Sequence, residues 1–300
     1  MGYMTHNFRG LALHTWTVDT TPLEGALAAA KAGGFDAVEL RRVDFTRCKE
    51  RGLSNDAVLD IIRASGLPVS AMGVEYGWIF SGGEERERLF GTFRETCENA
   101  VALGCGMMMS AIGPGTATAD EAVANIKRAG EIADGFGLKL TLEYQFQHPV
   151  VSSLDILRDM IGKAGRTNVG LLLDAYHLQR GGRPGRGFAD VPAAEIFYVQ
   201  FSDVPDAPPP SLPPVDRLPP GKGVVGWSDL FRLLAEKNYG GFLSYEAPNP
   251  AHWARPAVET AREGADAARR ALDIAFNATA GNARALPETT GSAPAEIRRA

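Results

Sequence analysis

Eight short apolar runs, each separated from the next by a longer segment, set the strongest constraint on how this chain can fold. The runs have strand length and lie at 11–16, 37–40, 68–74, 107–112, 138–142, 169–173, 196–201 and 241–245. Between them lie amphipathic segments of helix length at 22–31, 55–64, 84–103, 119–136, 153–163, 227–237 and 257–275, whereas 191–195 is short for a helix. Apolar strands that alternate with helices are typical of parallel βαβ units in a sheet covered on both faces.

Two α/β architectures can accommodate this alternation. Eight units over about 270 residues fit a closed (β/α)8 barrel, which usually takes roughly 250 residues. An open doubly wound sheet would place a glycine-rich phosphate-binding turn after the first strand. That turn reads Thr15-Trp16-Thr17-Val18-Asp19 and contains no glycine. We therefore predict a single (β/α)8 TIM barrel over residues 8–276, followed by a disordered or loosely docked tail at 279–300 that lacks any apolar period.

Composition excludes several classes of protein. The formal net charge of the 300-residue chain is −5, which argues against a protein that binds nucleic-acid phosphates. No apolar stretch reaches the roughly 20 residues of a membrane span, and the first ten residues contain no signal-peptide core. Three cysteines without a C-x-x-C pair are typical of reduced thiols. We expect a cytoplasmic protein with a small-molecule partner and with neither nucleic acid nor membrane as a partner.

Four consecutive apolar runs end in, or carry near their end, a side chain with an oxygen donor: Glu143, Asp174, Gln200 and Glu246. In a barrel these strand ends meet at one face, where active sites are built. Three carboxylates buried together are costly unless a cation compensates their charge. Oxygen donors without thiolate or imidazole favour Mn²⁺ or Mg²⁺, with Zn²⁺ and Co²⁺ as alternatives. Ordinary ion pairs with Arg or Lys are the other explanation, but four such residues in register favour a metal site.

Other polar and aromatic residues are expected near the same face. His177 follows Asp174 by three residues and Arg217 lies in the loop after the seventh run, although either could be a surface residue. His14, Trp16 and Glu39 close the first two runs and are candidates for lining a substrate pocket, and Glu39 could instead pair with Arg41 or Arg42. The residues after the third run could cap the pocket or simply pack: Glu75, Tyr76 and Trp78.

The combined motif resembles the xylose isomerase-like TIM-barrel superfamily over about residues 8 to 276. It consists of Glu143, Asp174-x-x-His177, Gln200-x-x-Asp203, Pro220-Gly221-Lys222-Gly223 and Glu246. This superfamily includes ketose 3-epimerases, inosose isomerases and dehydratases, dehydroshikimate dehydratases and, distantly, endonuclease IV. The resemblance implies a metal held by Glu143, Asp174, Gln200 and Glu246, and substrate contacts from His177 and Arg217.

One ligand position departs from the commonest pattern of the superfamily. The third ligand is usually His, and Gln200 stands there in this chain. Gln-containing sites resemble those of the dehydroshikimate dehydratase branch, as does the stretch 199–205 that surrounds Gln200. This departure counts against a simple epimerase and against zinc. Barrels of this type often form homo-oligomers through their helical side, and the sequence leaves the oligomeric state open.

The resemblance implies an isomerase or epimerase that acts on a ketose, an inosose or another keto sugar through an enediolate. We expect Glu143 and Glu246 to exchange the proton next to the carbonyl, since general acid–base catalysis of this kind contributes about 10²–10⁴-fold. A dehydratase, with His177 as proton donor, is the alternative. A DNA-repair endonuclease of this superfamily would need a His-rich site and a basic stripe, and five histidines in the whole chain count against it. A non-catalytic sugar-binding barrel is a further alternative, but it would not need paired acids.

Overall fold

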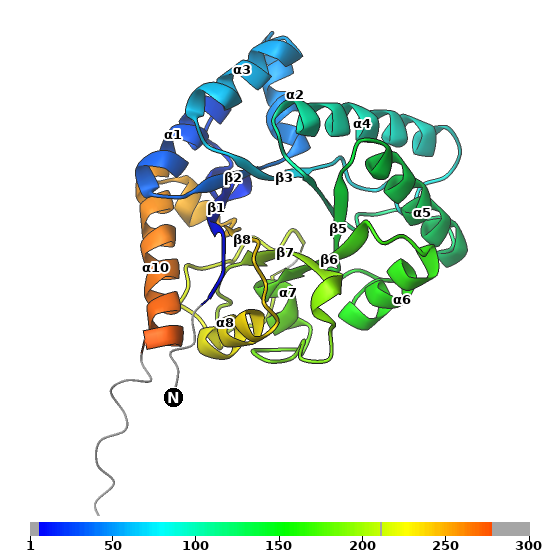
Figure 1. The fold of residues 1–300 in the computed structure, drawn as a ribbon. Helices are drawn as coiled ribbons and strands as arrows, with labels where there is room; N and C mark the ends of the chain where they lie inside the picture. Colours follow the sequence, from blue (N-terminus) through cyan, green and yellow to red (C-terminus); the bar gives the residue numbers. More distant parts are fainter. Residues whose placement is uncertain (1–5, 211, 278–300) are drawn as a thin grey trace, which may run out of the picture.

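The computed structural model describes residues 6–210 and 212–277, and it confirms the predicted α/β barrel. Eight parallel strands close on one another in chain order, with the helices outside them (Figure 1). The strands are β1 (Gly10–His14), β2 (Ala37–Leu40), β3 (Val69–Gly73), β4 (Met107–Ala111), β5 (Lys139–Glu143), β6 (Val169–Asp174), β7 (Ile196–Phe201) and β8 (Phe242–Tyr245).

Each predicted amphipathic segment forms a helix, and its ends follow local capping chemistry. These helices are α1 (Leu23–Gly33), α3 (Asn55–Ser65), α4 (Gly83–Ala102), α5 (Ala119–Gly135), α6 (Leu154–Ala164), α8 (Trp227–Glu236) and α10 (Ala257–Asn277). Thr118 and Glu121 form a capping box at the start of α5. Gly34 ends α1 with φ of 87°, a left-handed conformation that glycine adopts without a steric penalty.

Short helices are where the structure departs from the sequence prediction. The segment at 191–195 forms only the 3-10 helix Ala193–Glu195. Three α-helices of the described residues were not predicted: α2 (Arg42–Glu50), α7 (Ala175–Arg180) and α9 (Pro250–Trp253). They are too short, or too polar, to show an apolar period. Strand β1 ends at His14, so Trp16 lies in the 3-10 helix Thr15–Val18 instead of in the strand.

The barrel has two hydrophobic layers. Seven buried side chains fill its interior: Ala12, Ala37, Ala71, Met109, Leu172, Tyr198 and Phe242. A larger cluster lies between strands and helices, where α10 packs against α1 and α8. Small residues of β1–β3 therefore face larger ones of β4, β6, β7 and β8, which fills the interior and makes the barrel a packed core rather than a channel.

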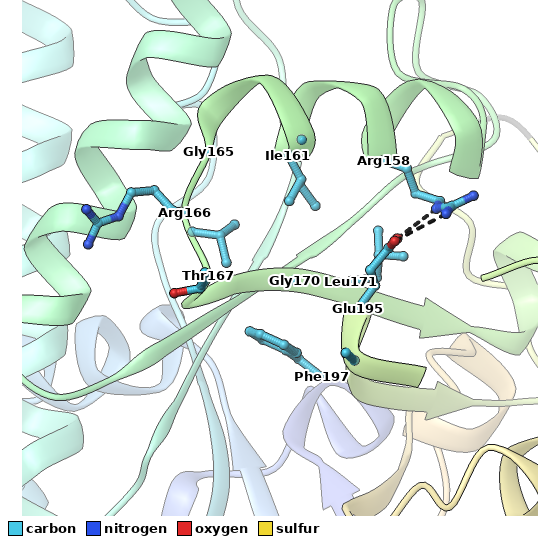
Figure 2. A pocket seen from close by; sticks show the side chains of 12 residues that line it. Arg158, Ile161, Gly165, Arg166, Thr167, Gly170, Leu171, Glu195 and Phe197 are labelled. Carbon is cyan, nitrogen blue, oxygen red and sulfur yellow. Dashed lines mark hydrogen bonds and ion pairs between the residues drawn. The ribbon is translucent and has the colours of Figure 1, made fainter. Parts of the chain in front are cut away.

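Outside the barrel, the amino ends of β6 and β7 border a groove of about 570 Å³. Figure 2 shows Ile161 and Arg158 of α6 on one side and Phe197 on the other, with Arg158 paired to Glu195. This groove lies at the end of the barrel opposite the predicted site. Within the described residues, no helix is long and apolar enough to cross a membrane. The tail predicted at 279–300 lies outside the described residues.

Candidate active site

The carboxyl ends of β5 to β8 bring the four predicted oxygen donors to one face of the barrel. Glu143 and Asp174 are the last residues of their strands, and Glu246 directly follows β8. Gln200 lies opposite Asp174 in the β6–β7 register. All four are buried, with at most 4% of their surface exposed. The alternation of strands and loops thus places three carboxyl groups where water cannot solvate them.

Arg217 inserts its side chain among these carboxyl groups from the loop between β7 and α8. Its Nη1 donates to Asp174 Oδ2 at 2.7 Å and to Glu246 Oε2 at 2.7 Å. Only 1% of Arg217 is exposed, and its guanidinium lies 4.4 Å from the centre of the Tyr176 ring. Arg217 is therefore an interior residue that bridges two of the predicted metal ligands, and a surface role is wrong.

The loop that carries Arg217 is organised by Asp203, to which sequence reasoning assigned no separate role. The fully buried Asp203 carboxylate accepts hydrogen bonds from the backbone N–H groups of Val204, Gly221 and Val225 and from Trp227 Nε1. An added Cβ at Gly223 would lie 2.1 Å from the Val204 carbonyl oxygen, so glycine is required there. The Gln200-x-x-Asp203 and Pro-Gly-x-Gly motifs together fix the path of this loop.

His177 completes a compact group on the β5–β6 side of the site. Glu143, Asp174 and His177 each offer one potential metal-ligand atom, and these three atoms lie within 4.8 Å of one another. His177 Nε2 is 3.7 Å from Glu143 Oε1 and 3.9 Å from Asp174 Oδ2. Burial lowers the pKa of His177 to about 3, so its imidazole is neutral at physiological pH. A neutral imidazole beside two carboxylates can serve as a metal ligand as well as a substrate contact.

The unbalanced charge and unpartnered oxygens of this face fit a divalent cation. Three carboxyl groups face one guanidinium, which leaves an excess of negative charge when all are ionised. Glu143 Oε1 and Gln200 Oε1 are buried and have no hydrogen-bond partner among the residues that the structure describes. Buried oxygens of this kind are costly unless something satisfies them, and hard divalent ions prefer carboxylate and amide oxygens.

Glu39 and His14 form the opposite wall of the same interior space. Gln200 Nε2 donates to Glu39 Oε1 at 2.9 Å, so the expected alternative in which Glu39 pairs with an arginine is wrong. This hydrogen bond orients the Gln200 amide and leaves its oxygen, Oε1, without a hydrogen-bond partner among the described residues. His14 Nδ1 accepts from the Trp16 N–H, and its Nε2 lies 3.4 Å from Glu246 Oε1. Burial, followed by the charges of Arg41 and Arg217, lowers the pKa of His14 well below its usual value.

Burial raises the pKa values of three acids of the site. It raises the pKa of Glu246 to about 7, although the Arg217 charge opposes the shift. It raises the pKa of Glu143 well above its usual value, with further contributions from the negative charges of Glu246 and Asp174. It raises the pKa of Glu39 to about 8. With a pKa near ambient pH, Glu246 can both take and return a proton, which is the property that general acid–base catalysis needs.

The residues after β3 divide between packing and the mouth of the barrel. Trp78 is fully buried and donates to Ser110 Oγ at 2.9 Å, so it packs rather than covering the site. Tyr76 is 42% exposed, yet its hydroxyl lies 3.8 Å from Met109 Sδ in the barrel interior. The Tyr76 side chain therefore reaches from the loop after β3 to Met109 of the neighbouring strand β4.

Comparison with known proteins agrees with this geometry. The family model of the xylose isomerase-like TIM barrel matches residues 27–271. The chain is 30% identical to an inosose isomerase of Halalkalibacterium halodurans over 138 residues, which cover 44% of the chain and 49% of that relative. It is 27% identical to a 3-dehydroshikimate dehydratase of Pseudomonas aeruginosa over 266 residues, which cover 83% of the chain and 40% of that relative.

Both matches span half or less of the relative's length. A solved structure, described as an IolI protein with a bound zinc atom, superposes with a TM-score of 0.79 at 20% identity, covering 89% of this chain and 99% of the other. That superposition shows a shared fold. With the family model matching most of the barrel and the strand-end acids in place, the chain belongs to the xylose isomerase-like TIM barrel family.

Proposed function

We propose that the protein is a divalent-metal-dependent isomerase or epimerase that enolises a ketose, an inosose or another keto sugar. The observation that carries the proposal is the buried cluster of Glu143, Asp174 and Glu246, in which one arginine offsets only part of the negative charge. Glu143, Asp174, Gln200 and Glu246 would hold the ion, with His177 close enough to Glu143 and Asp174 to join them.

The residues of this chain would then move one proton. A divalent ion at this site would polarise the substrate carbonyl and offset the negative charge of the enediolate. The Glu143 carboxylate takes the proton from the carbon next to the carbonyl, and the C–H electron pair moves into the enediolate. The Glu246 carboxyl group returns a proton. Delivery to the opposite face of the same carbon gives the epimer. Delivery to the former carbonyl carbon gives the isomer, and the proton of the neighbouring hydroxyl group then passes to the former carbonyl oxygen.

A dehydratase is the second candidate, because the dehydroshikimate dehydratase match covers 83% of the chain, compared with 44% for the inosose isomerase. In that reaction the same enolate expels a β-hydroxyl group, which leaves as water after protonation by His177. Burial lowers the pKa of His177 to about 3, so the imidazolium form that would donate this proton is scarcely populated at neutral pH. This favours the reactions that need only the two glutamates.

The first chemical step is common to these reactions, so it is the step to measure. The experiment follows exchange of the α-proton in D₂O by NMR, with Mg²⁺ as the ion. The substrates are ketohexoses, inososes and 3-dehydroshikimate. Exchange in one compound is expected, and the product formed with it decides between epimerase, isomerase and dehydratase. No exchange in any of them, by protein that has been shown to bind the ion, would overturn the proposal.

A further inference from the structure

A pocket of about 420 Å³ opens beside the candidate site, where β1, β2 and β3 end. The apolar part of its wall consists of Trp16, Val43, Val74 and Tyr76. We propose that this pocket, called the side pocket below, binds an uncharged ring that is linked to the keto sugar. The substrate would then be a glycoside rather than a free monosaccharide. This inference rests on the proposed function, because it extends the substrate of the same site.

The side pocket and the candidate site share a wall. The ring of Tyr76 lines the pocket, while its hydroxyl reaches Met109 inside the barrel. Burial of the hydroxyl end raises the pKa of Tyr76, and the negative charges of Glu246, Glu143 and Glu39 add to the shift. On the β1 side, Trp16 lies two residues after His14. The Nε2 atom of His14 is 3.4 Å from Glu246 Oε1. The side pocket and the candidate site are therefore neighbours, and the proposed ligand would span them.

The charged side chains of the pocket wall already have partners of opposite charge. Arg41 donates to Asp19 Oδ1 at 2.6 Å and to Asp44 Oδ1 at 3.1 Å. Arg42 donates to Glu95 Oε2 at 2.9 Å, and Glu75 accepts from Arg88 at 2.6 Å. A phosphate or carboxylate in the pocket would have to compete for these arginines. An uncharged group would leave these ion pairs intact. The wall of the side pocket therefore favours an uncharged ligand.

The shape and chemistry of the remaining wall favour a ring. A volume of about 420 Å³ is in the range of small-molecule sites, which lie at roughly 300–1,000 Å³. Trp and Tyr present flat apolar faces with a polar edge, and contacts between two rings are worth about 0.5–1.5 kcal/mol beyond their buried area. Either the C–H face of a second sugar or an aromatic aglycone has this chemistry.

Direct binding measurements on the full chain test the side pocket without relying on turnover. The ligands are phenyl β-D-glucoside and cellobiose, with methyl β-D-glucoside as the ringless reference, and calorimetry gives the dissociation constants. The wild-type chain is expected to bind at least one ring-bearing ligand about fivefold to tenfold more tightly than the reference. Preference for the phenyl compound would identify an aglycone as the natural group, and preference for cellobiose would identify a second sugar.

Three variants make the test specific. Trp16→Leu removes the aromatic face and Val43→Trp fills the pocket, and both should abolish the preference for ring-bearing ligands. Phe197→Leu is the matched control, because Phe197 lines the groove at the other end of the barrel (Figure 2) and should leave the preference intact. The side-pocket proposal would be overturned if the wild-type chain showed no preference for ring-bearing ligands, or if this preference persisted in both pocket variants.

A separate measurement distinguishes this inference from the proposed function. A free inosose carries no linked ring, so its α-proton exchange by the wild-type chain tests the carboxyl cluster alone. Exchange of inosose without any preference for ring-bearing ligands would overturn the side pocket only. A ring preference without exchange of any keto sugar, including 3-keto derivatives of the preferred glycoside, would overturn the proposed function.

Discussion

The two halves of the barrel mouth balance their charges in different ways. At the ends of β5 to β8, Glu143, Asp174 and Glu246 are buried around the single guanidinium of Arg217. At the ends of β1 to β3, Arg41 is matched by Asp19 and Asp44, and the rest of the wall is largely apolar. In the first half three buried acids share one arginine, whereas in the second each arginine of the side-pocket wall pairs with an acid. Under the proposed function and the proposed side pocket, the β5–β8 half is called the chemical half and the β1–β3 half the recognition half.

The largest effect is expected from the acids of the chemical half. Glu143→Gln and Glu246→Gln should each lower the rate of α-proton exchange by about 10²–10⁴-fold, because each removes a group that moves the proton. Circular dichroism should show an unchanged fold. The matched control is Glu195→Gln, at the opposite end of the barrel, which should keep the wild-type rate. A glutamine variant that retains full exchange would remove that acid from the mechanism.

Arg217 provides the next largest effect. Arg217→Met leaves Asp174 and Glu246 buried without their shared partner, and breaking a buried ion pair in this way costs about 3–5 kcal/mol. Urea denaturation of the metal-free protein should show this loss. Addition of Mn²⁺ should recover part of it, since the cation replaces the lost positive charge. If the variant is as stable as the wild type without metal, Arg217 does not balance the cluster.

Glu39 of β2 lies in the β1–β3 half and accepts a hydrogen bond from Gln200 of the β5–β8 half, so the pH dependence of stability tests how the two halves meet. The pKa of Glu39 is about 8 in the folded protein and near 4.5 when the chain is unfolded, so the unfolded state loses this proton first. The stability of the metal-free protein should therefore fall as pH rises from about 4.5 to about 8. Glu39→Gln should remove that part of the slope and gain a few kcal/mol at most at pH 8, since one pKa unit is worth about 1.4 kcal/mol.

Equilibrium denaturation across this pH range checks the prediction. The amide oxygen that Glu39→Gln introduces can still accept from Gln200, so lost hydrogen bonding does not confound the result. A wild-type slope that is unchanged in the variant would place the Glu39 pKa close to its ordinary value in the folded protein.

The smallest effect is expected on the recognition half. Arg42 pairs with Glu95, whose side chain is 56% exposed, and pairs of this kind contribute about 0–1 kcal/mol. Arg42→Ala should therefore change the free energy of unfolding by less than about 1 kcal/mol, measured by urea denaturation. A loss as large as that of Arg217→Met would show that both halves depend on buried charge.

The alternation of apolar runs and helices predicted the barrel well, because a (β/α)8 fold repeats one pattern that short-range periodicity reveals. Its polar strand ends also predicted which residues meet, since register follows from the closed sheet. Helices α2, α7 and α9 were not predicted, because a helix of only a few turns is too short to show an apolar period. A pattern that repeats along the chain can be recognised from the sequence, whereas a single short helix cannot.

Side-chain direction was the part of the site that sequence could not supply. The sequence placed Arg217 and Glu39 near the mouth, but it could not show that Arg217 bridges Asp174 and Glu246. It also could not show that Glu39 accepts from Gln200. These contacts depend on how a long loop returns over the barrel and on which face of a strand each residue occupies. The Gln200-x-x-Asp203 spacing was the one available signal, since Asp203 fixes that loop.

The most direct test of the division between the halves is a Mn²⁺ titration followed by electron paramagnetic resonance. Two buried aspartates provide a matched pair: Asp174 in the chemical half and Asp44 in the recognition half. Wild type and Asp44→Asn should bind one ion with equal affinity. Asp174→Asn should bind at least about 100-fold more weakly, since even groups that only support metal ligands contribute 10–100-fold. Equal binding by Asp174→Asn, or loss of binding in Asp44→Asn alone, would contradict the assignment of the cation to the β5–β8 half.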